Sequence, residues 1–565
     1  MTPHRCPAAL LLAACAAAGC AVDRSPDAGA PDTGPVTVQL LAINDFHGYL
    51  DPPDGADGAD GDRGGAAWVV GLADALRAEH RHTVVVGAGD MVGASPLVSG
   101  LFHDEPTIAF LDRLGLRYTA VGNHEFDAGT DALRRLQNGG CAAVTEETPR
   151  QSCALGPYDG AGFGYLSANV VERDSGMPLF PPFAVETVPL DGGGDLRIAF
   201  VGLVLAETPS LVTAEAVADV RFKPVAETAN ALLPALRAAD PDAIVLLLHE
   251  GGAVPEGQGA DGDCPDLGGA LVPVLDALDP AYDIIVSGHT HEVYVCERDG
   301  RLITSAGEYG RWLTRIRLRF DPASGALAGR SARNIAVAHE GGAVSYRPDP
   351  AIAAMVDAYR MRAAPIMDRP VGRITADLTL QPDAGGMTAI GAVVADARLA
   401  AMAAHDPDFA VVNIGGVRAS LLAGGTGVVS HGDLLRVQPF GDELLLVTLS
   451  GAEVRALLAQ QWREDGAPEL LQVSRGLSYA WHSNGTGSGA VVPGSVRVAG
   501  RPLDDDATYR VVISSYLAGG GDGFGVLTDA PLMARGPGDV PALGAYFAAH
   551  SPLSPPSGAR VRRQH

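Results

Sequence analysis

Five short segments of the chain carry the residue types that bind metal ions, and each of them follows an apolar run. Asp, His and Asn offer oxygen and nitrogen donors suited to zinc, manganese or iron. The glycines among them let the backbone approach a ligand closely and adopt unusual turn angles. The segments are Asn44-Asp45-Phe46-His47-Gly48, Gly87-Ala88-Gly89-Asp90, Gly122-Asn123-His124-Glu125-Phe126-Asp127, His249-Glu250 and Ser287-Gly288-His289-Thr290-His291.

The apolar runs in this part of the chain are typical of strands buried on both faces of a sheet. They alternate with Ala- and Leu-rich stretches that predict helices. Ligands of α/β sheets bind outside the carboxyl ends of the strands, so we expect the five segments to converge on one site. The clearest predicted strands cover residues 36–43, 83–86, 198–201, 243–248 and 284–286.

The 565 residues are too many for one ordinary domain, and the pattern changes near residue 349. Residues 349–364 predict a helix that starts at Asp349-Pro350 and precedes Pro365. The part that follows has strands of its own. These predicted strands cover residues 409–412, 443–449 and 509–513. We therefore expect two α/β domains joined by a helix.

The first residues indicate export. A short basic lead ends at Arg5, and the apolar run 7–19 that follows is typical of a signal peptide. Leu12-Ala-Ala-Cys15 and Ala17-Ala-Gly-Cys20 both resemble the lipobox of bacterial lipoproteins, so either cysteine could be lipidated. The alternative is an ordinary cleaved signal. Residues 21–36, rich in Pro, Gly and Asp, predict a flexible tether.

Four cysteines remain beyond the leader, and an even number in an exported protein suggests two disulfides. Three pairings are possible, and we favour the neighbouring ones, Cys141–Cys153 and Cys264–Cys296. The formal net charge of −26 argues against a nucleic-acid polymer as partner, because such proteins need a basic surface. A small anionic substrate remains compatible with it, since bound cations can dominate the local field.

The order of the segments, D-x-H, GD, GNH(E), H and GHxH, resembles that of the calcineurin-like metallophosphoesterases. The form NDFHG…GNHEFD is similar to the 5′-nucleotidase family, which includes UDP-sugar hydrolases and 2′,3′-cyclic phosphodiesterases, and the resemblance covers residues 37–530. It implies a four-layer α/β-β/α metallophosphoesterase sandwich over 37–345, a linker helix over 346–366 and a C-terminal α/β substrate-binding domain over 367–550.

The resemblance also implies two divalent metal ions, zinc or manganese, that generate hydroxide from water. One ion would be held by Asp45, His47 and His291, the other by Asn123, His249 and His289, and Asp90 would bridge them. His124 and Asp127 resemble the catalytic dyad of the family, in which the His assists the leaving group and the Asp orients it. The alternative for Asp127 is a helix N-cap. Glu125 and Glu250 are expected to support other groups or face solvent.

In the second domain, Asn413-Ile-Gly-Gly-Val-Arg418 resembles a family motif whose Arg contacts phosphate. Phe440 and Tyr516 resemble two aromatic residues that stack on the base, with Asp522 accepting the ribose hydroxyls. Without the resemblance, both rings would be interpreted as core residues. The chain departs from the family at several positions. Ala392, Asp442 and Ser514-Ser515 replace the usual Asn, and residues 381–386 hold no basic residue.

The resemblance therefore implies an exported dimetal phosphoesterase that hydrolyses nucleotide phosphate esters, of the 5′-nucleotidase or UDP-sugar hydrolase type, by metal-activated hydroxide. A 2′,3′-cyclic nucleotide or a non-nucleotide phosphomonoester is the alternative substrate, and a non-catalytic surface binding protein is the alternative from another class. We expect a periplasmic or cell-surface protein that contacts the membrane only through an N-terminal lipid. The oligomeric state is left open.

Overall fold

The computed structural model describes residues 36–53, 63–143, 151–190, 194–255, 264, 266–321, 324–462, 468–483 and 489–564. The expected leader, with Cys15 and Cys20, lies outside the described residues, as does the tether apart from Val36. Within the described ranges, every helix is too short or too polar to cross a membrane.

Two six-stranded sheets form the first domain. The first sheet has the order β14-β13-β1-β2-β3-β4, in which β1 to β4 are parallel. Its strands are β14 (Leu327–Ala336), β13 (Trp312–Phe320), β1 (Val36–Ile43), β2 (Thr83–Ala88), β3 (Leu116–Ala120) and β4 (Gly164–Leu166). The second sheet consists of β11 (Val293–Arg298), β12 (Arg301–Ala306), β10 (Ile284–Ser287), β9 (Ala243–His249), β7 (Asp195–Val204) and β6 (Phe183–Pro189), in that order.

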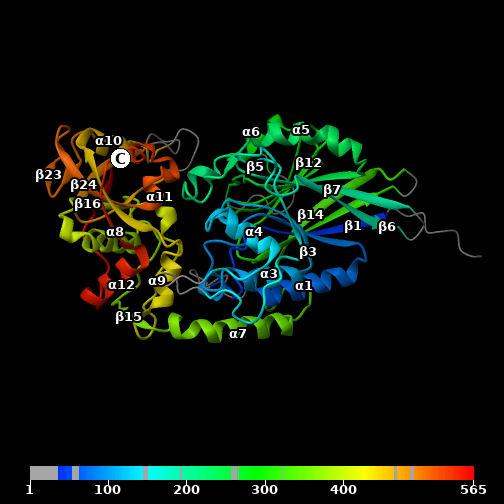
Figure 1. Cartoon of the computed structure of the whole chain (residues 1–565), viewed down its shortest axis with the longest axis horizontal. Helices are drawn as coiled ribbons and strands as arrows, with labels where there is room; N and C mark the ends of the chain where they lie inside the picture. Colours follow the sequence, from blue (N-terminus) through cyan, green and yellow to red (C-terminus); the bar gives the residue numbers. More distant parts are fainter. Residues whose placement is uncertain are drawn as a thin grey trace, which may run out of the picture.

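The two sheets pack face to face, and helices cover their outer faces (Figure 1). Leu40 of β1, Phe200 of β7 and Val245 of β9 lie in the apolar core between the sheets. The first sheet is covered by α1 (Ala66–Glu79), α3 (Glu105–Leu114) and α4 (Thr130–Asn138), and the second by α5 (Val225–Ala238) and α6 (Leu271–Ala277). The four-layer α/β-β/α sandwich is therefore confirmed.

Helix α7 (Pro350–Met367) connects the two domains along one side of the molecule (Figure 1). Asp349 caps it by accepting hydrogen bonds from the backbone N–H groups of Ala351 and Ile352. The sequence predicted an end before Pro365, but the helix continues to Met367. Pro365 removes one N–H in the last turn, and the N–H of Asp368 still closes that turn on the carbonyl of Ala364 at 2.8 Å.

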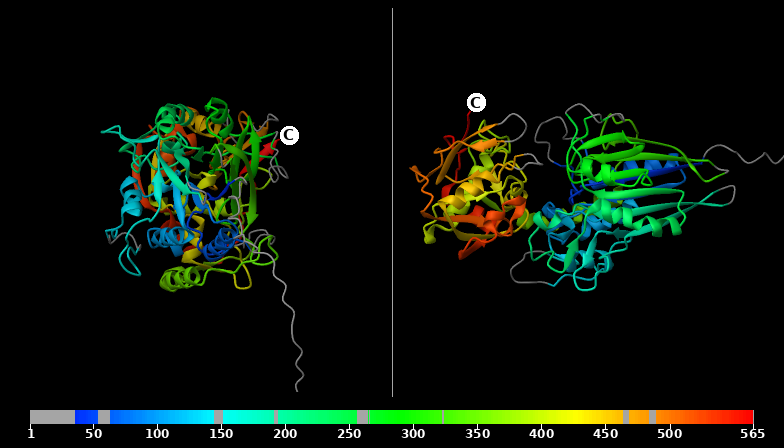
Figure 2. Two further views of the ribbon diagram at one scale, coloured as in Figure 1. Left: turned by 90° about the vertical axis from the view of Figure 1, so that its right-hand side faces the viewer. Right: turned by 90° about the horizontal axis from the view of Figure 1, so that it is seen from above.

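A five-stranded mixed sheet forms the centre of the second domain, which lies at one end of the first domain (Figure 2). Its order is β19 (Gln472–Val473), β16 (Phe409–Val412), β24 (Thr508–Ser514), β18 (Glu443–Ser450) and β25 (Leu532–Gly538). Helices α8 (Ala389–Ala401) and α12 (Asp539–His550) cover one face, and α10 (Gly451–Ala459) covers the other. The prediction of two α/β domains is confirmed.

Smaller elements complete the molecule. A second sheet of the C-terminal part contains β21 (Gly489–Val491), β20 (Leu477–Ser483), β22 (Arg497–Val498) and β23 (Arg501–Pro502), and β26 (Val561–Gln564) pairs with β20. Two-stranded sheets are formed by β15 (Pro370–Arg373) with β17 (Val428–Ser430), and by β5 (Val170–Glu172) with β8 (Val220–Phe222). The remaining helices are α2 (Leu97–Gly100), α9 (His431–Val437) and α11 (Ser515–Ala518).

Both favoured disulfides are confirmed. Cys141 pairs with Cys153 and Cys264 with Cys296, across sequence separations of 12 and 32 residues. The second disulfide ties the segment before α6 to β11, beside the strands that carry the site.

Candidate functional site

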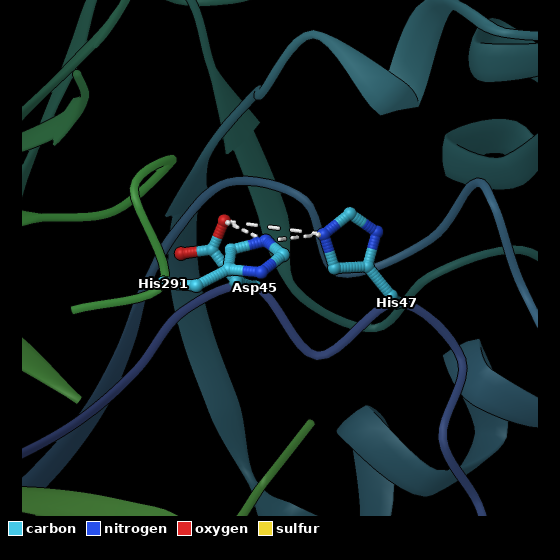
Figure 3. Close-up of side chains that lie close together, drawn as sticks. All are labelled: Asp45, His47 and His291. Carbon is cyan, nitrogen blue, oxygen red and sulfur yellow. Dashed lines mark hydrogen bonds and ion pairs between the residues drawn. The ribbon is translucent and has the colours of Figure 1, made fainter. Parts of the chain in front are cut away.

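The structure brings the seven predicted metal-ligating side chains together at the carboxyl ends of five strands. Asp45 and His47 follow β1, Asp90 follows β2, Asn123 follows β3, His249 ends β9, and His289 and His291 follow β10. Ligand atoms lie within 4.8 Å of one another in three groups. The groups are Asp45, His47 and His291, then His47, Asp90 and His124, and then Asp90, His249 and His289. Figure 3 shows the first group.

His47 and His291 face each other through their Nε2 atoms, which are 3.2 Å apart. The other nitrogen of each ring lies against an acceptor. His47 Nδ1 is 3.0 Å from the carbonyl oxygen of Gly93, and His291 Nδ1 is 2.5 Å from Glu308 Oε2. These acceptors favour a proton on Nδ1 of each ring, which leaves the two Nε2 atoms to share one proton or one cation. Burial holds the pKa of His47 well below its usual value and keeps that ring neutral. A metal ion bound by both Nε2 atoms would therefore satisfy the two rings at once.

The second half of the cluster shows the same excess of acceptors. His249 donates from Nδ1 to the carbonyl oxygen of Ala88 at 2.8 Å, while its Nε2 lies 3.0 Å from Asp90 Oδ2 and 3.1 Å from Asn123 Oδ1. Burial lowers the pKa of His249, but the Asp90 carboxylate, together with the charge of Asp45 and the hydrogen bond to Ala88, outweighs burial and raises it to about 10. Burial, followed by the charge of His249, lowers the pKa of His289 to about 3. The cluster therefore requires a positive charge, supplied by a proton or a metal ion, and its donor set fits divalent cations.

The loops that hold these ligands have unusual backbone angles. Asp45, His47, Asp90, His289 and His291 have φ values of 49°, 48°, 53°, 73° and 60°. Residues other than glycine adopt this left-handed backbone region at a cost in energy. Such strained residues are common at functional sites. Gly122 is required for a different reason, since a Cβ atom there would lie 2.1 Å from Asp90 Oδ1. The strain and the close contact fix where the ligand atoms point.

Two glutamates support the ligands, and sequence reasoning assigned a specific role to neither. Glu125 is 3% exposed and accepts hydrogen bonds from the backbone N–H groups of Asp90 (2.8 Å), Met91 (2.8 Å) and Gly122 (2.5 Å). It therefore fixes the loop that presents Asp90. Glu308, which holds His291, was missed altogether. Its position just after β12 is the signal that could have found it, because the ligands also follow their strands.

The predicted dyad is formed, with His124 Nδ1 at 2.9 Å from Asp127 Oδ2. Burial lowers the pKa of His124, but the carboxylates of Asp127 and Asp90 outweigh burial and raise it above its usual value. Asp127 also accepts a hydrogen bond from the N–H of Ala94 at 3.1 Å. The alternative of a helix cap is wrong, since α4 has Gly129 at its N-cap position and no capping side chain.

A cavity of about 320 Å³ lies over the cluster, and both domains line it. The first domain contributes Asp90, Asn123, His124, Asp127, Leu211, Val212, Thr213, His289, Thr290 and His291, and the second contributes Asn413, Gly415, Gly416, Arg418, Phe440, Asp442, Tyr516 and Asp522. All five predicted substrate-binding residues are among them. The wall at residues 211–213 was missed, because an apolar pair and a threonine in a loop carry no sequence signal.

The two aromatic residues of the cavity have different neighbours. The Phe440 ring stacks on the His124 imidazole, with centroids 5.8 Å apart and an interplanar angle of 17°. Tyr516 donates its hydroxyl proton to Asp522 Oδ1 at 2.5 Å, and its ring packs against Gly521. Asn413 donates to the other oxygen of Asp522 at 2.8 Å. Of the residues predicted to bind a nucleoside, Phe440 therefore contacts the dyad, while Asn413 and Tyr516 both contact Asp522.

Two family profiles match the chain. The calcineurin-like phosphoesterase profile matches residues 38–293, and the profile of the 5′-nucleotidase C-terminal domain matches residues 370–529. The crystal structure of a 5′-nucleotidase precursor from Thermus thermophilus is 26% identical, with a TM-score of 0.74, and the match covers 94% of this chain and 99% of that one.

Two curated relatives are each 30% identical to this chain. Endonuclease YhcR of Bacillus subtilis (strain 168) matches over 86% of this chain, and cell wall protein Lmo0130 of Listeria monocytogenes serovar 1/2a matches over 89% of it. Both relatives are longer proteins. The chain spans 37% of the length of the first and 66% of the length of the second.

Proposed function

We propose that this chain is a metal-dependent hydrolase of nucleotide phosphate esters, because it belongs to the family that joins a calcineurin-like phosphoesterase domain to a 5′-nucleotidase C-terminal domain. One observation carries the proposal. The proposed metal ligands of the first domain line the same cavity as Arg418, Phe440, Tyr516 and Asp522 of the second domain.

The proposed ligands of two divalent ions, zinc or manganese, are the seven residues of the cluster. Asp45, His47 and His291 would hold one ion, Asn123, His249 and His289 would hold the other, and Asp90 would bridge them. When bound, such ions polarise phosphoryl oxygens and lower the pKa of water. The net charge of the ligands, with two carboxylates among seven side chains, leaves the loaded site positive and therefore suited to a phosphate dianion.

The residues of the chain itself have distinct proposed roles in the reaction. Arg418 presents a planar guanidinium that pairs with phosphate oxygens. As water forms the new P–O bond and the ester P–O bond breaks, His124 Nε2 gives a proton to the leaving oxygen. Asp127 accepts a hydrogen bond from Nδ1–H of His124 and so keeps the ring oriented toward the leaving group.

The remaining residues of the cavity provide the proposed nucleoside site. Phe440 and Tyr516 would offer ring faces to a base, and Asn413 and Asp522, which line the same cavity, would contact the hydroxyl groups of a sugar. One observation favours a second candidate, a 2′,3′-cyclic or non-nucleotide phosphate ester. Both oxygens of Asp522 already accept hydrogen bonds, from Tyr516 and Asn413, so ribose hydroxyls must compete for them.

We also propose that the protein is exported and lipid-anchored through Cys15 or Cys20, with domain bounds at 37–345, 346–366 and 367–550. Two disulfides support export, because such bonds persist in oxidising compartments. A relative named as a cell wall protein supports it as well.

The test is phosphate release by the chain loaded with zinc or manganese, with AMP, UDP-glucose, 2′,3′-cyclic AMP and p-nitrophenyl phosphate as substrates. The control is Asp90→Ala, which removes the shared carboxylate of the cluster. We expect turnover of a nucleotide that the control loses. Activity on the aryl phosphate alone would refute the nucleotide, and equal activity in the Asp90→Ala variant would refute the metal site.

A further inference from the structure

The charges that line the cavity are unevenly distributed. Apart from histidines, Arg418 is the basic side chain among its described lining residues. The acidic ones are Asp90 and Asp127 near the cluster, and Asp442 and Asp522 on the wall from the second domain. Arg418 lies within electrostatic range of His47, His124 and Glu308, so it belongs to the end where the metal ligands gather.

The wall from the second domain presents carboxylates beside the two aromatic rings. Asp442 accepts hydrogen bonds through one oxygen, Oδ1, from the hydroxyl of Ser515 at 2.8 Å and from the N–H of Tyr516 at 3.2 Å. These bonds fix the carboxylate at the start of α11, the helix that carries Tyr516. Among the described residues, Asp442 forms no ion pair, and its neighbour Glu443 pairs with Arg535 instead.

The buried Arg398 lies close enough to interact electrostatically with Asp442, but it also interacts with the carboxylate of Asp539. Arg398 is 2% exposed and interacts with both Asp442 and Asp539. Burial raises the pKa of Asp539 to about 7. At pH 8, two carboxylates therefore share one guanidinium, and a negative charge remains at the cavity wall.

This arrangement restricts what the substrate can carry. A substrate whose reacting phosphate lies at the cluster must extend toward Phe440 and Tyr516. A second phosphate would add negative charge to a cavity that Asp127, Asp442 and Asp522 also line, with Arg418 already engaged at the cluster. The cavity volume of about 320 Å³ lies at the low end of the range of roughly 300–1,000 Å³ for small-molecule sites, so it favours one phosphate and one small group.

We propose that this cavity selects phosphate esters with one phosphate and a neutral or cationic, hydroxyl-bearing leaving group, and that Asp442 is the residue that rejects a second phosphate. The inference rests on the proposed function and narrows it. Nucleoside monophosphates are substrates, whereas nucleoside polyphosphates and nucleotide sugars are disfavoured.

The experiment compares kcat/KM for AMP and for ADP at pH 8 with saturating metal, in the wild-type chain and in Asp442→Asn. Asn keeps an oxygen that accepts both hydrogen bonds and removes only the charge. We expect the wild-type chain to prefer AMP by more than about tenfold and the variant to lose roughly five- to tenfold of that preference, the size of a charge contact in a medium close to bulk water. Glu443→Gln is the matched control, because it removes a charge at the next position, which faces Arg535, and it should leave the ratio unchanged.

A second pair of substrates tests the negative charge of the cavity wall in the wild-type chain alone. It requires neither a nucleotide substrate nor a variant that folds. The wild-type chain should hydrolyse 4-carbamoylphenyl phosphate faster than 4-carboxyphenyl phosphate. Equal use of AMP and ADP, or an unchanged ratio in Asp442→Asn, would overturn the inference while the proposed function stands. If only aryl phosphates are hydrolysed, the nucleotide proposal fails, and the aryl pair decides the charge selection. If no ester is hydrolysed, both fail.

Discussion

Glu308 accepts the Nδ1 proton of His291 at 2.5 Å, and this single contact orients a proposed metal ligand. Partners of this kind fix the tautomer and direction of a histidine, and their loss typically weakens metal affinity by about 10–100-fold. We expect Glu308→Gln to bind zinc more weakly by roughly that factor. Competition with a chelator measures this directly, without any assay of turnover.

Glu297→Gln is the control for Glu308→Gln, because Glu297 is an exposed residue of β11 in the same domain. It should bind zinc as tightly as the wild-type chain does. If Glu308→Gln also retains wild-type affinity, Glu308 does not position His291 for a metal ion.

Asp127 tests a different part of the site, since it orients His124 and belongs to none of the metal-ligand groups among the described residues. Asp127→Asn should lower kcat by roughly 10²–10⁴-fold, the usual contribution of a positioned acid, and should leave the metal content unchanged. Asp131→Asn, at a fully exposed position of α4, is the matched control. A simultaneous loss of metal would show that Asp127 supports the ligands rather than the proton transfer.

At the scale of elements, the start of α7 anchors the connector to the first domain. Asp349 is 8% exposed, caps the helix through Oδ1 and accepts a hydrogen bond from Arg113 at 2.5 Å through Oδ2. Asp349→Ala should therefore destabilise the protein by about 1–2 kcal/mol. Thermal unfolding measures the loss. Asp357→Ala, which changes an exposed carboxylate of the same helix, should stay within about 0.5 kcal/mol of the wild-type chain, and an equal loss in both variants would contradict the anchoring role.

The strands that carry the site could be predicted because each is a continuous apolar run. The predicted runs 36–43, 83–86, 243–248 and 284–286 became β1, β2, β9 and β10 with ends displaced by at most two residues. Parallel strands end at one edge of a sheet, so the convergence of polar segments followed from general rules. That two separate sheets, packed face to face, supply the ligands came from the family resemblance and not from the runs.

The parts that could not be predicted depend on contacts between residues distant in the sequence. The sequence assigned Glu125 no specific role, and only the structure shows that it accepts hydrogen bonds from four backbone N–H groups. The stacking of Phe440 on His124 joins residues of different domains. The wall at residues 211–213 lies in a loop without polar signals. Packing between domains decides these contacts, and local sequence patterns do not encode it.

At the scale of the whole molecule, the net charge and the shape of the cavity both disfavour a polynucleotide substrate. A formal net charge of −26 repels polyanions, and binding to nucleic acids requires basic side chains that neutralise several phosphates. The two domains enclose the cluster in a cavity of about 320 Å³, with walls from residues 211–213 on one side and Phe440 and Tyr516 on the other.

We therefore expect that the chain hydrolyses small phosphate esters but leaves polynucleotides intact, although one relative that is 30% identical is named an endonuclease. That name belongs to a protein of which this chain spans only 37%, so it does not carry over. The measurement incubates supercoiled plasmid and single-stranded DNA with metal-loaded protein, at a concentration that turns over AMP completely. Nicking that persists through purification and disappears in Asp90→Ala would contradict the expectation, because it would place a polymer phosphate at the same cluster. Nicking that survives in Asp90→Ala would come from a contaminating nuclease, since the variant lacks the carboxylate shared by both halves of the site.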